Sequence, residues 1–221
     1  MPSAENRVII QRVIKGCSGL SDGLAQQMLT SGIICNWWRK VVTLPQHEVP
    51  LRLTDRNLDW HQNAFLEPDP QEGGEPFVRH TPFISTTAGT VERDEAMQRN
   101  LLFPAWQVAL QFATNGWQED GWLFYCYLFV LGRRSVPHQA FSEELRELNI
   151  HTGYSPFQPE GEIAAKIVIP AAQIERVERY DIDDLLGALD NGRRPVPAWS
   201  EANLVHFVPP ERIMNIRQPL L

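Results

Sequence analysis

The segment Trp122–Leu131 (WLFYCYLFVL) constrains the fold most, because every side chain in it is apolar or aromatic. An extended chain that is apolar on both faces is typical of a strand at the centre of a sheet. We therefore predict a central strand here and expect Cys126, within it, to be a buried thiol. Further strands are predicted over Phe83–Thr87, Ile163–Ile169 and Ile174–Tyr180.

Short helical patterns separate these strands without the regular alternation of a doubly wound fold. Helices are predicted over Ser21–Ser31, Asp55–Phe65, Glu92–Gln98, Ala105–Thr114 and Phe141–Leu148, and from Asp181 on. Val8–Ile14 suits a short helix or a buried strand equally, and Ile33–Trp38 suits a strand or a helix end, whereas Val49–Leu53 is predicted to be extended. The pattern indicates an α+β fold with two small mixed or antiparallel sheets around a cleft and short flanking helices.

Length and composition favour one soluble domain. The 221 residues can bury a sizeable core. We divide the chain into an N-terminal extension (residues 1–46) packed on the core, a core domain (47–182) and a C-terminal wrap (183–221). The net charge of −7 argues against a large nucleic-acid footprint or a polybasic membrane patch. Neither a secretion signal nor an apolar run long enough to span a membrane is present in this sequence.

The three cysteines, Cys17, Cys35 and Cys126, fit no zinc-binding spacing, so no metal is expected. A disulfide between Cys17 and Cys35 is left open, since the sequence does not decide it.

Two glutamates mark the start of the Ile163–Ile169 strand. Glu160 and Glu162 lie two residues apart and would point to the same face, while Gly161 between them lets another backbone approach. Such a pair is either a solvated strand end or two carboxylates that divide a chemical task, one stabilising a developing cation and the other assisting a nucleophile.

Two further segments carry candidate site residues. Ser85, Thr86 and Thr87 form a hydroxyl-rich strand end, and a serine there could hydrogen-bond a nearby carboxylate. Arg52 lies among apolar neighbours, and its guanidinium suits a phosphate if it lies inside a cleft. Arg39, preceded by two tryptophans, is the alternative arginine.

An arginine, a Ser-Thr-Thr strand and a Glu-x-Glu strand start, in this order, resemble the mono-ADP-ribosyltransferase toxins of the Arg–Ser–Glu class. The resemblance is to heat-labile enterotoxin and cholera toxin A subunits and their pierisin-like and scabin-like relatives. It covers residues 49 to 180, and its most similar segments are Phe77–His80 with Phe83–Thr87, and Gly153–Pro156 with Glu160–Glu162.

The resemblance implies a glycosyltransferase with an NAD-binding cleft. Such enzymes cleave NAD+ between nicotinamide and ribose and transfer ADP-ribose to an acceptor. By resemblance, Glu162 would stabilise the oxocarbenium-like ribose, Ser85 would orient Glu162, and Arg52 would hold the pyrophosphate or neighbouring ribose. Thr86, Thr87 and His80 are assigned with them to NAD+ binding.

In the resembled family, a glutamate two residues before the catalytic one accompanies arginine acceptors. Glu160 therefore implies a protein arginine acceptor, with Phe157 and Gln158 facing it, and the chain is expected to be a secreted or injected effector toxin. Three alternatives stay open: an NAD+ glycohydrolase, a guanine- or DNA-directed transferase, which the acidic charge disfavours, and a degenerate binding module without activity.

Overall fold

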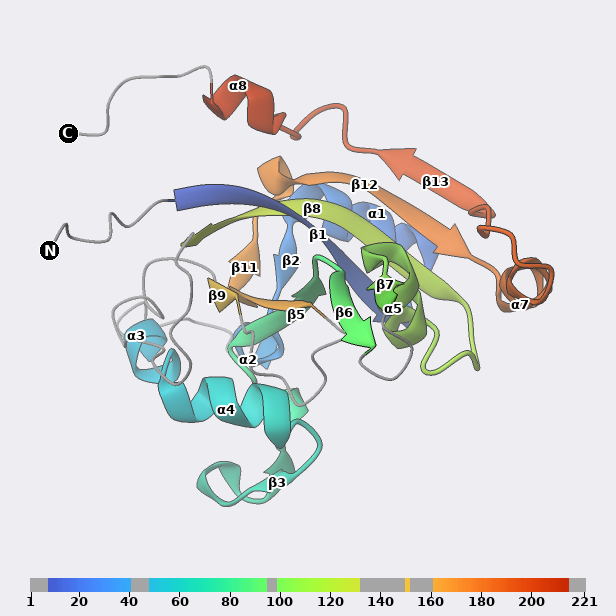
Figure 1. Ribbon diagram of the computed structural model, residues 1–221. Helices are drawn as coiled ribbons and strands as arrows, with labels where there is room; N and C mark the ends of the chain where they lie inside the picture. Colours follow the sequence, from blue (N-terminus) through green and yellow to red (C-terminus); the bar gives the residue numbers. More distant parts are fainter. Residues whose placement is uncertain (1–7, 41–47, 95–98, 132–149, 152–160, 215–221) are drawn as a thin grey trace, which may run out of the picture.

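The computed structural model describes residues 8–40, 48–94, 99–131, 150–151 and 161–214. Over these residues the chain has the α+β class and the antiparallel strand pairing that the sequence predicts (Figure 1). The helices are α1 (Asp22–Ser31), α2 (Asn36–Lys40), α3 (Val49–Arg52), α4 (Asp55–Asn63), α5 (Ala105–Ala113), α7 (Ile182–Asp190) and α8 (Pro210–Met214), with 3-10 turns η2 (Pro70–Glu72), η3 (Phe77–Arg79) and η5 (Ala171–Gln173).

The strands form one main sheet and three two-stranded ribbons. They are β1 (Val8–Ser18), β2 (Ile33–Ile34), β3 (Pro68–Asp69), β4 (Glu75–Pro76), β5 (Phe83–Thr87), β6 (Thr90–Asp94), β7 (Arg99–Phe103), β8 (Gly121–Leu131), β9 (Ile150–His151), β10 (Glu162–Lys166), β11 (Val168–Ile169), β12 (Ile174–Tyr180) and β13 (Trp199–Ala202). The main sheet has the order β13-β12-β8-β1-β5-β10-β9, and β11-β2, β3-β4 and β6-β7 are the ribbons.

The main sheet has two halves that meet at a narrow junction. β1 pairs with β8 along its whole length, and β10 pairs with all of β5. Between β1 and β5, however, the described register contains only the pair Ile14↔Thr87. The two sheets expected from the sequence are therefore halves of one sheet, and β1 separates from β5 beyond Ile14.

The strand β8 is buried on both faces, which confirms the central position predicted for it. Phe124, Cys126 and Leu128 pack into the larger apolar cluster together with α1 and α2, whereas Leu123 belongs to a smaller cluster with α5 and α7. Figure 1 shows α1 and α5 on opposite sides of the β1–β8 pair. All three cysteines are free thiols, so Cys17 and Cys35 are not bridged.

The N-terminal segment is part of the core rather than an extension packed on it. From Val8 on it supplies β1 to the middle of the main sheet, and α1 and α2 add Ala25, Leu29 and Trp37 to the larger cluster. Helix α1 begins where the sequence predicts, because the Ser21 hydroxyl accepts a hydrogen bond from the Leu24 N–H at 3.2 Å.

Two local predictions were wrong. Val49–Leu53 was expected to be extended, but Val49–Arg52 forms α3, with Pro50 in the first turn, where its fixed φ and missing N–H cost nothing. Glu92–Gln98 was expected to be helical, but its first residues belong to β6, because pairing with β7 overrides local helix propensity. The helix predicted over Phe141–Leu148 lies outside the described residues.

A sharp turn at Ile167 divides the predicted Ile163–Ile169 strand into β10 and β11. Ile167 has a φ of +58°, which is uncommon for a β-branched residue. Its N–H donates to the Pro82 carbonyl at 2.9 Å, and its carbonyl accepts from the Cys35 N–H at 2.8 Å. The chain thereby leaves β5 and pairs with β2, which ties the start of α2 to the main sheet.

Among the helices that the structure describes, none is both long and apolar enough to cross a bilayer.

Candidate active site

A cavity of about 600 Å³ opens where β1 separates from β5. Its walls include β1 (Ile14 to Ser18), the β2–α2 segment (Ile33 to Asn36, and Arg39), the end of α4 with the residues after it (His61 to Leu66), and β5 with Glu162 of β10. Helix α5 closes one side, and its backbone touches Gly16, where a Cβ atom would collide with the Ala109 carbonyl. The volume lies in the range of small-molecule sites.

Glu162 is the first residue of β10 and is 8 % exposed. Gly161 before it has a φ of +53°, and a Cβ atom there would collide with the backbone of Gly89. The Gly161 carbonyl also accepts a hydrogen bond from the Ala88 N–H at 3.0 Å. The close approach expected at Gly161 is thus confirmed, and it fixes the position from which Glu162 projects.

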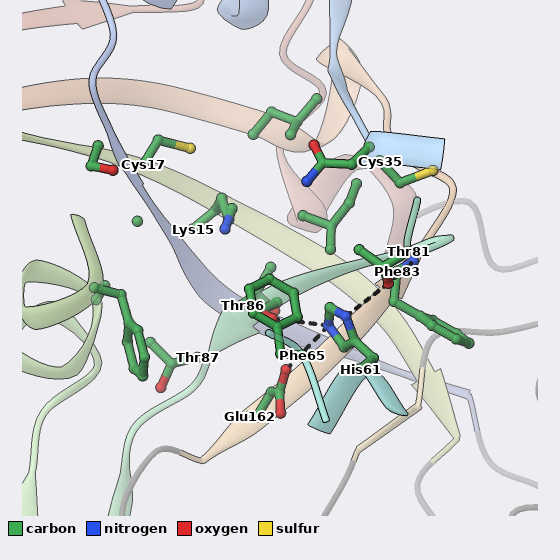
Figure 2. Close-up of a pocket in the computed structure, with 18 of the residues that line it drawn as sticks. Lys15, Cys17, Cys35, His61, Phe65, Thr81, Phe83, Thr86, Thr87 and Glu162 are labelled. Atoms are coloured by element: carbon green, nitrogen blue, oxygen red, sulfur yellow. Dashed lines mark hydrogen bonds and ion pairs between the residues drawn. The ribbon is translucent and has the colours of Figure 1, made fainter. Parts of the chain in front are cut away.

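Ser85 and Glu162 both contact the same histidine, His61. Glu162 pairs with Thr87 and Ala164 with Ser85, so Ser85 lies diagonally across from Glu162 on the same face. His61 of α4 lies over this face (Figure 2), with its Nε2 2.9 Å from Ser85 Oγ and 3.5 Å from Glu162 Oε1. Ser85 therefore contacts the shared histidine in the described structure.

Thr81 and two aromatic rings hold His61 in place. Thr81 Oγ1 lies 2.9 Å from His61 Nδ1 and accepts a hydrogen bond from the Phe83 N–H at 3.2 Å. The rings of Phe65 and Phe83 have centroids 5.5 and 5.6 Å from that of His61. Because both ring nitrogens have polar partners and the ring is buried, His61 has one orientation, directed at Ser85 and Glu162.

Two cations line the opposite side of the cavity. Lys15 projects from β1 and Arg39 from the last turn of α2. Figure 2 shows Lys15 on the β1 side, with His61 and Glu162 on the other side. In the part of the chain that the structure describes, no carboxylate pairs with either cation. Among the described residues, the cavity therefore has unpaired positive charge on one wall and the carboxylate of Glu162 on the other.

The pKa values of the two cysteines that line the cavity, Cys17 and Cys35, reflect both its burial and its cations. Burial raises the pKa of Cys17, although Lys15 and Arg39 oppose the shift. Burial likewise raises the pKa of Cys35 to about 11, against backbone hydrogen bonds and the charge of Arg39. Both thiols are therefore protonated and unreactive near neutral pH.

The two threonines of β5 differ in what their hydroxyls do. Thr86 Oγ1 donates to the Ile163 carbonyl at 2.6 Å, so this hydroxyl ties β5 to β10. Thr87 Oγ1 accepts from the Gly89 N–H at 3.0 Å, next to the Gly161 contact. Both residues line the cavity, and these two hydroxyl contacts stabilise the strand and the loop after it.

Arg52 and His80 do not lie with Ser85 and Glu162. Both line a second cavity, together with Arg56, Asp69 and Glu72. The Arg52 guanidinium forms an ion pair with Glu72 and lies over the Trp37 ring, 5.5 Å from its centroid. The segment carrying Arg52 is the helix α3 rather than a strand, and Arg52 lines this second cavity and not the one that holds Glu162.

The second cavity is organised around the buried carboxylate of Asp69. Arg56 contacts both Asp69 oxygens, at 2.7 and 3.3 Å, and His80 Nε2 lies 3.3 Å from Oδ2. Burial alone would raise the pKa of Asp69, but hydrogen bonds from Arg56, the Gln71 N–H and His80 lower it to about 2. His80 is thus a partner of Asp69, not of the first cavity.

Glu160, Phe157 and Gln158 lie outside the described residues, so their predicted roles stay predictions. Within the described ranges, no group of three or more His, Cys, Asp or Glu side chains is placed to hold a metal ion.

The sequence patterns did not identify Lys15 and His61 as site residues. Lys15 lies between the ambiguous segment Val8–Ile14 and a glycine, and His61 lies inside a predicted helix. The glycine after Lys15 was the available local signal, since it indicates close backbone approach. No local pattern identifies His61, because its partners are 20 or more residues away in sequence.

No protein-family model and no curated protein sequence matches this chain. Several solved structures resemble it, and two of them show how low the identity is. A protein named EcPltA has 14 % identity and a TM-score of 0.42, over 90 % of this chain and 88 % of the other. The catalytic domain of the mosquitocidal toxin from Bacillus sphaericus, in a single-residue variant, has 12 % identity and a TM-score of 0.41, over 95 % and 62 %. At these TM-scores neither likeness carries an argument about this chain.

Proposed function

We propose that this chain is a mono-ADP-ribosyltransferase that cleaves NAD+ and transfers ADP-ribose to a protein arginine, as an effector toxin. One observation carries the proposal: the cavity holds Glu162, contacted by His61, on one wall, and on the other Lys15 and Arg39, which have no carboxylate partner among the described residues. NAD+ has the complementary charges, because its pyrophosphate is anionic and its nicotinamide ring is a cation.

This charge arrangement supports one orientation of the substrate. Lys15 and Arg39 would bind the pyrophosphate, in the role that the sequence assigned to Arg52. The nicotinamide-bearing ribose would then lie against Glu162. The toxin assignment rests on the resemblance of the motifs, and the acceptor assignment rests on Glu160 and its place before Glu162.

In the transfer step, the bond between ribose C1′ and the nicotinamide nitrogen breaks, and its electron pair goes to that nitrogen. Positive charge then develops on the ribose, where the Glu162 carboxylate stabilises it more strongly than in the ground state. His61, held by Thr81, keeps Ser85 and Glu162 in position. An arginine nitrogen bonds to C1′ and loses a proton, which Glu160 would accept.

The experiment is nicotinamide release from NAD+ by the purified chain, with and without the arginine analogue agmatine. We expect agmatine to accelerate release and Glu162→Gln to lower it by roughly 10²–10³-fold, because the charge is lost while the shape is kept. Glu211→Gln is the matched control, since Glu211 is exposed and pairs with Arg12 far along the chain.

Each outcome has a distinct meaning. Release that agmatine does not change would favour a glycohydrolase or another acceptor. Normal release by Glu162→Gln would remove Glu162 from the mechanism. An absence of both NAD+ binding and release would leave a binding module.

A further inference from the structure

One polar group in the wall of the Glu162 cavity has no hydrogen-bond partner. Gln62 follows His61 in the last turn of α4 and lines the cavity. Its Nε2 is buried, and among the described residues no acceptor lies within hydrogen-bond distance of it. Buried amide donors are almost always satisfied in folded proteins, and an unsatisfied one is destabilising. An orphaned donor beside a substrate cavity indicates that a ligand supplies the acceptor.

The position of Gln62 indicates which end of the substrate it meets. The His61 ring lies between Ser85 and Glu162, so the end of α4 faces the part of the cavity where the reacting ribose would lie. The cations of the pyrophosphate side come from β1 and α2, on the other wall. Gln62 therefore faces the ribose and leaving-group end of the substrate.

The chemistry of a primary amide narrows the choice further. Gln62 has one acceptor oxygen and a nitrogen with two donors, and the carboxamide of nicotinamide has the same set. Two primary amides pair reciprocally through two hydrogen bonds. Turning the Gln62 amide by half a rotation exchanges its atoms but leaves this pairing possible. A guanidinium has donors only, so it could not satisfy the Nε2 donor.

An aromatic ring in the same wall suits the rest of the leaving group. Phe65 lies three residues after Gln62, lines the cavity and contacts the His61 ring edge-on (Figure 2). A flat pyridinium cation is attracted to the face of an aromatic ring.

We infer that Gln62 recognises the carboxamide of the leaving nicotinamide, with the pyridinium ring against Phe65. This inference rests on the proposed function. It makes Gln62 a specificity-determining residue that selects dinucleotides carrying a primary amide on the pyridine ring.

The experiment compares leaving-group release from three dinucleotides: NAD+, its acetylpyridine analogue, which keeps the carbonyl but lacks the N–H donors, and its nicotinic acid analogue, which carries a carboxylate. We expect the wild type to prefer NAD+. Gln62→Leu should raise the KM for NAD+ roughly tenfold and bring the kcat/KM ratio of NAD+ to acetylpyridine analogue close to one. Gln62→Glu keeps the shape and can still accept from the amide N–H groups, so it should retain the preference for NAD+ over the acetylpyridine analogue, whereas like charge should exclude the nicotinic acid analogue.

Asn63→Ala is the control, since Asn63 is exposed on the same turn and bonds only Asp59 among the described residues. The ratio of two substrates on one preparation does not change if part of the variant is misfolded. An active wild type would overturn the inference and leave the proposed function intact if Gln62→Leu keeps the wild-type ratio of NAD+ to acetylpyridine analogue and Gln62→Glu uses the nicotinic acid analogue as well as the wild type does. A wild type that releases nothing from NAD+ would overturn the proposed function, and this inference with it.

Discussion

Two cavities lie beside different parts of α4, and they differ in how their cations are paired. In the second cavity, Arg52 pairs with Glu72 and Arg56 with Asp69. In the first cavity, neither Lys15 nor Arg39 has a carboxylate partner among the described residues. A cation that already pairs with a carboxylate attracts an anionic ligand only weakly. An unpaired cation in a cavity attracts such a ligand more strongly. We therefore assign the second cavity to stability and the first to binding.

The largest effect that would test this contrast is expected at Lys15. Lys15→Met should raise the KM for NAD+ roughly thirtyfold, the equivalent of one lost hydrogen bond to a charged group. The midpoint of thermal unfolding should stay unchanged, because Lys15 forms no ion pair with the described residues that the substitution would remove. Lys40→Met is the control, since Lys40 pairs with Glu75 on the surface. An unchanged KM in Lys15→Met would break the contrast.

Asp69 should show the opposite behaviour, a change in stability without a change in NAD+ binding. Its folded pKa of about 2 lies below the usual value of 3.8. The stabilisation is therefore present above pH 4 and lost as the pH falls toward 2, and it amounts to about 2 kcal/mol. Urea unfolding between pH 2 and pH 7 should show this loss in the wild type, and Asp69→Asn should be less stable at pH 7 and lack the dependence.

The smallest effect is expected at Arg52, the arginine that the sequence favoured. Its ion pair with Glu72 is partly exposed, at 30 % for both side chains, so Arg52→Met should cost no more than about 1 kcal/mol in the free energy of unfolding. Nicotinamide release should stay within roughly twofold of the wild type. A large fall in release with unchanged stability would instead return Arg52 to the binding site.

Local patterns predicted the parts of the site that depend on neighbours in sequence. The hydroxyl-rich strand Phe83–Thr87 and the glycine before Glu162 were identified because strand alternation and close backbone approach leave marks within a few residues. The register of β5 and β10 then places Ser85 and Glu162 on one face. The apolar run at β8 predicted its central position for the same reason.

On the cationic side, the sequence named Arg39 as the alternative arginine but could not decide between it and Arg52, and it did not point to Lys15. Whether an arginine lies in a strand or a helix depends on packing, and Val49–Arg52 became a single helical turn. Whether a cation is paired depends on residues distant in sequence, such as Glu72 for Arg52, 20 positions away. No short stretch of sequence shows both the secondary structure around an arginine and the distant residue that pairs with it.

The sequence by itself determined the α+β class, the central strand, the position of Glu162 beside a backbone contact, and the absence of a zinc-binding cysteine pattern. These follow from periodicity, steric freedom and composition, which act over short distances along the chain. The tertiary structure decided that β1 belongs to the core, that β1 and β5 separate after Ile14, and that His61 joins Ser85 to Glu162. Those features arise from contacts between distant segments, where packing decides which side chains meet and which charges stay unpaired.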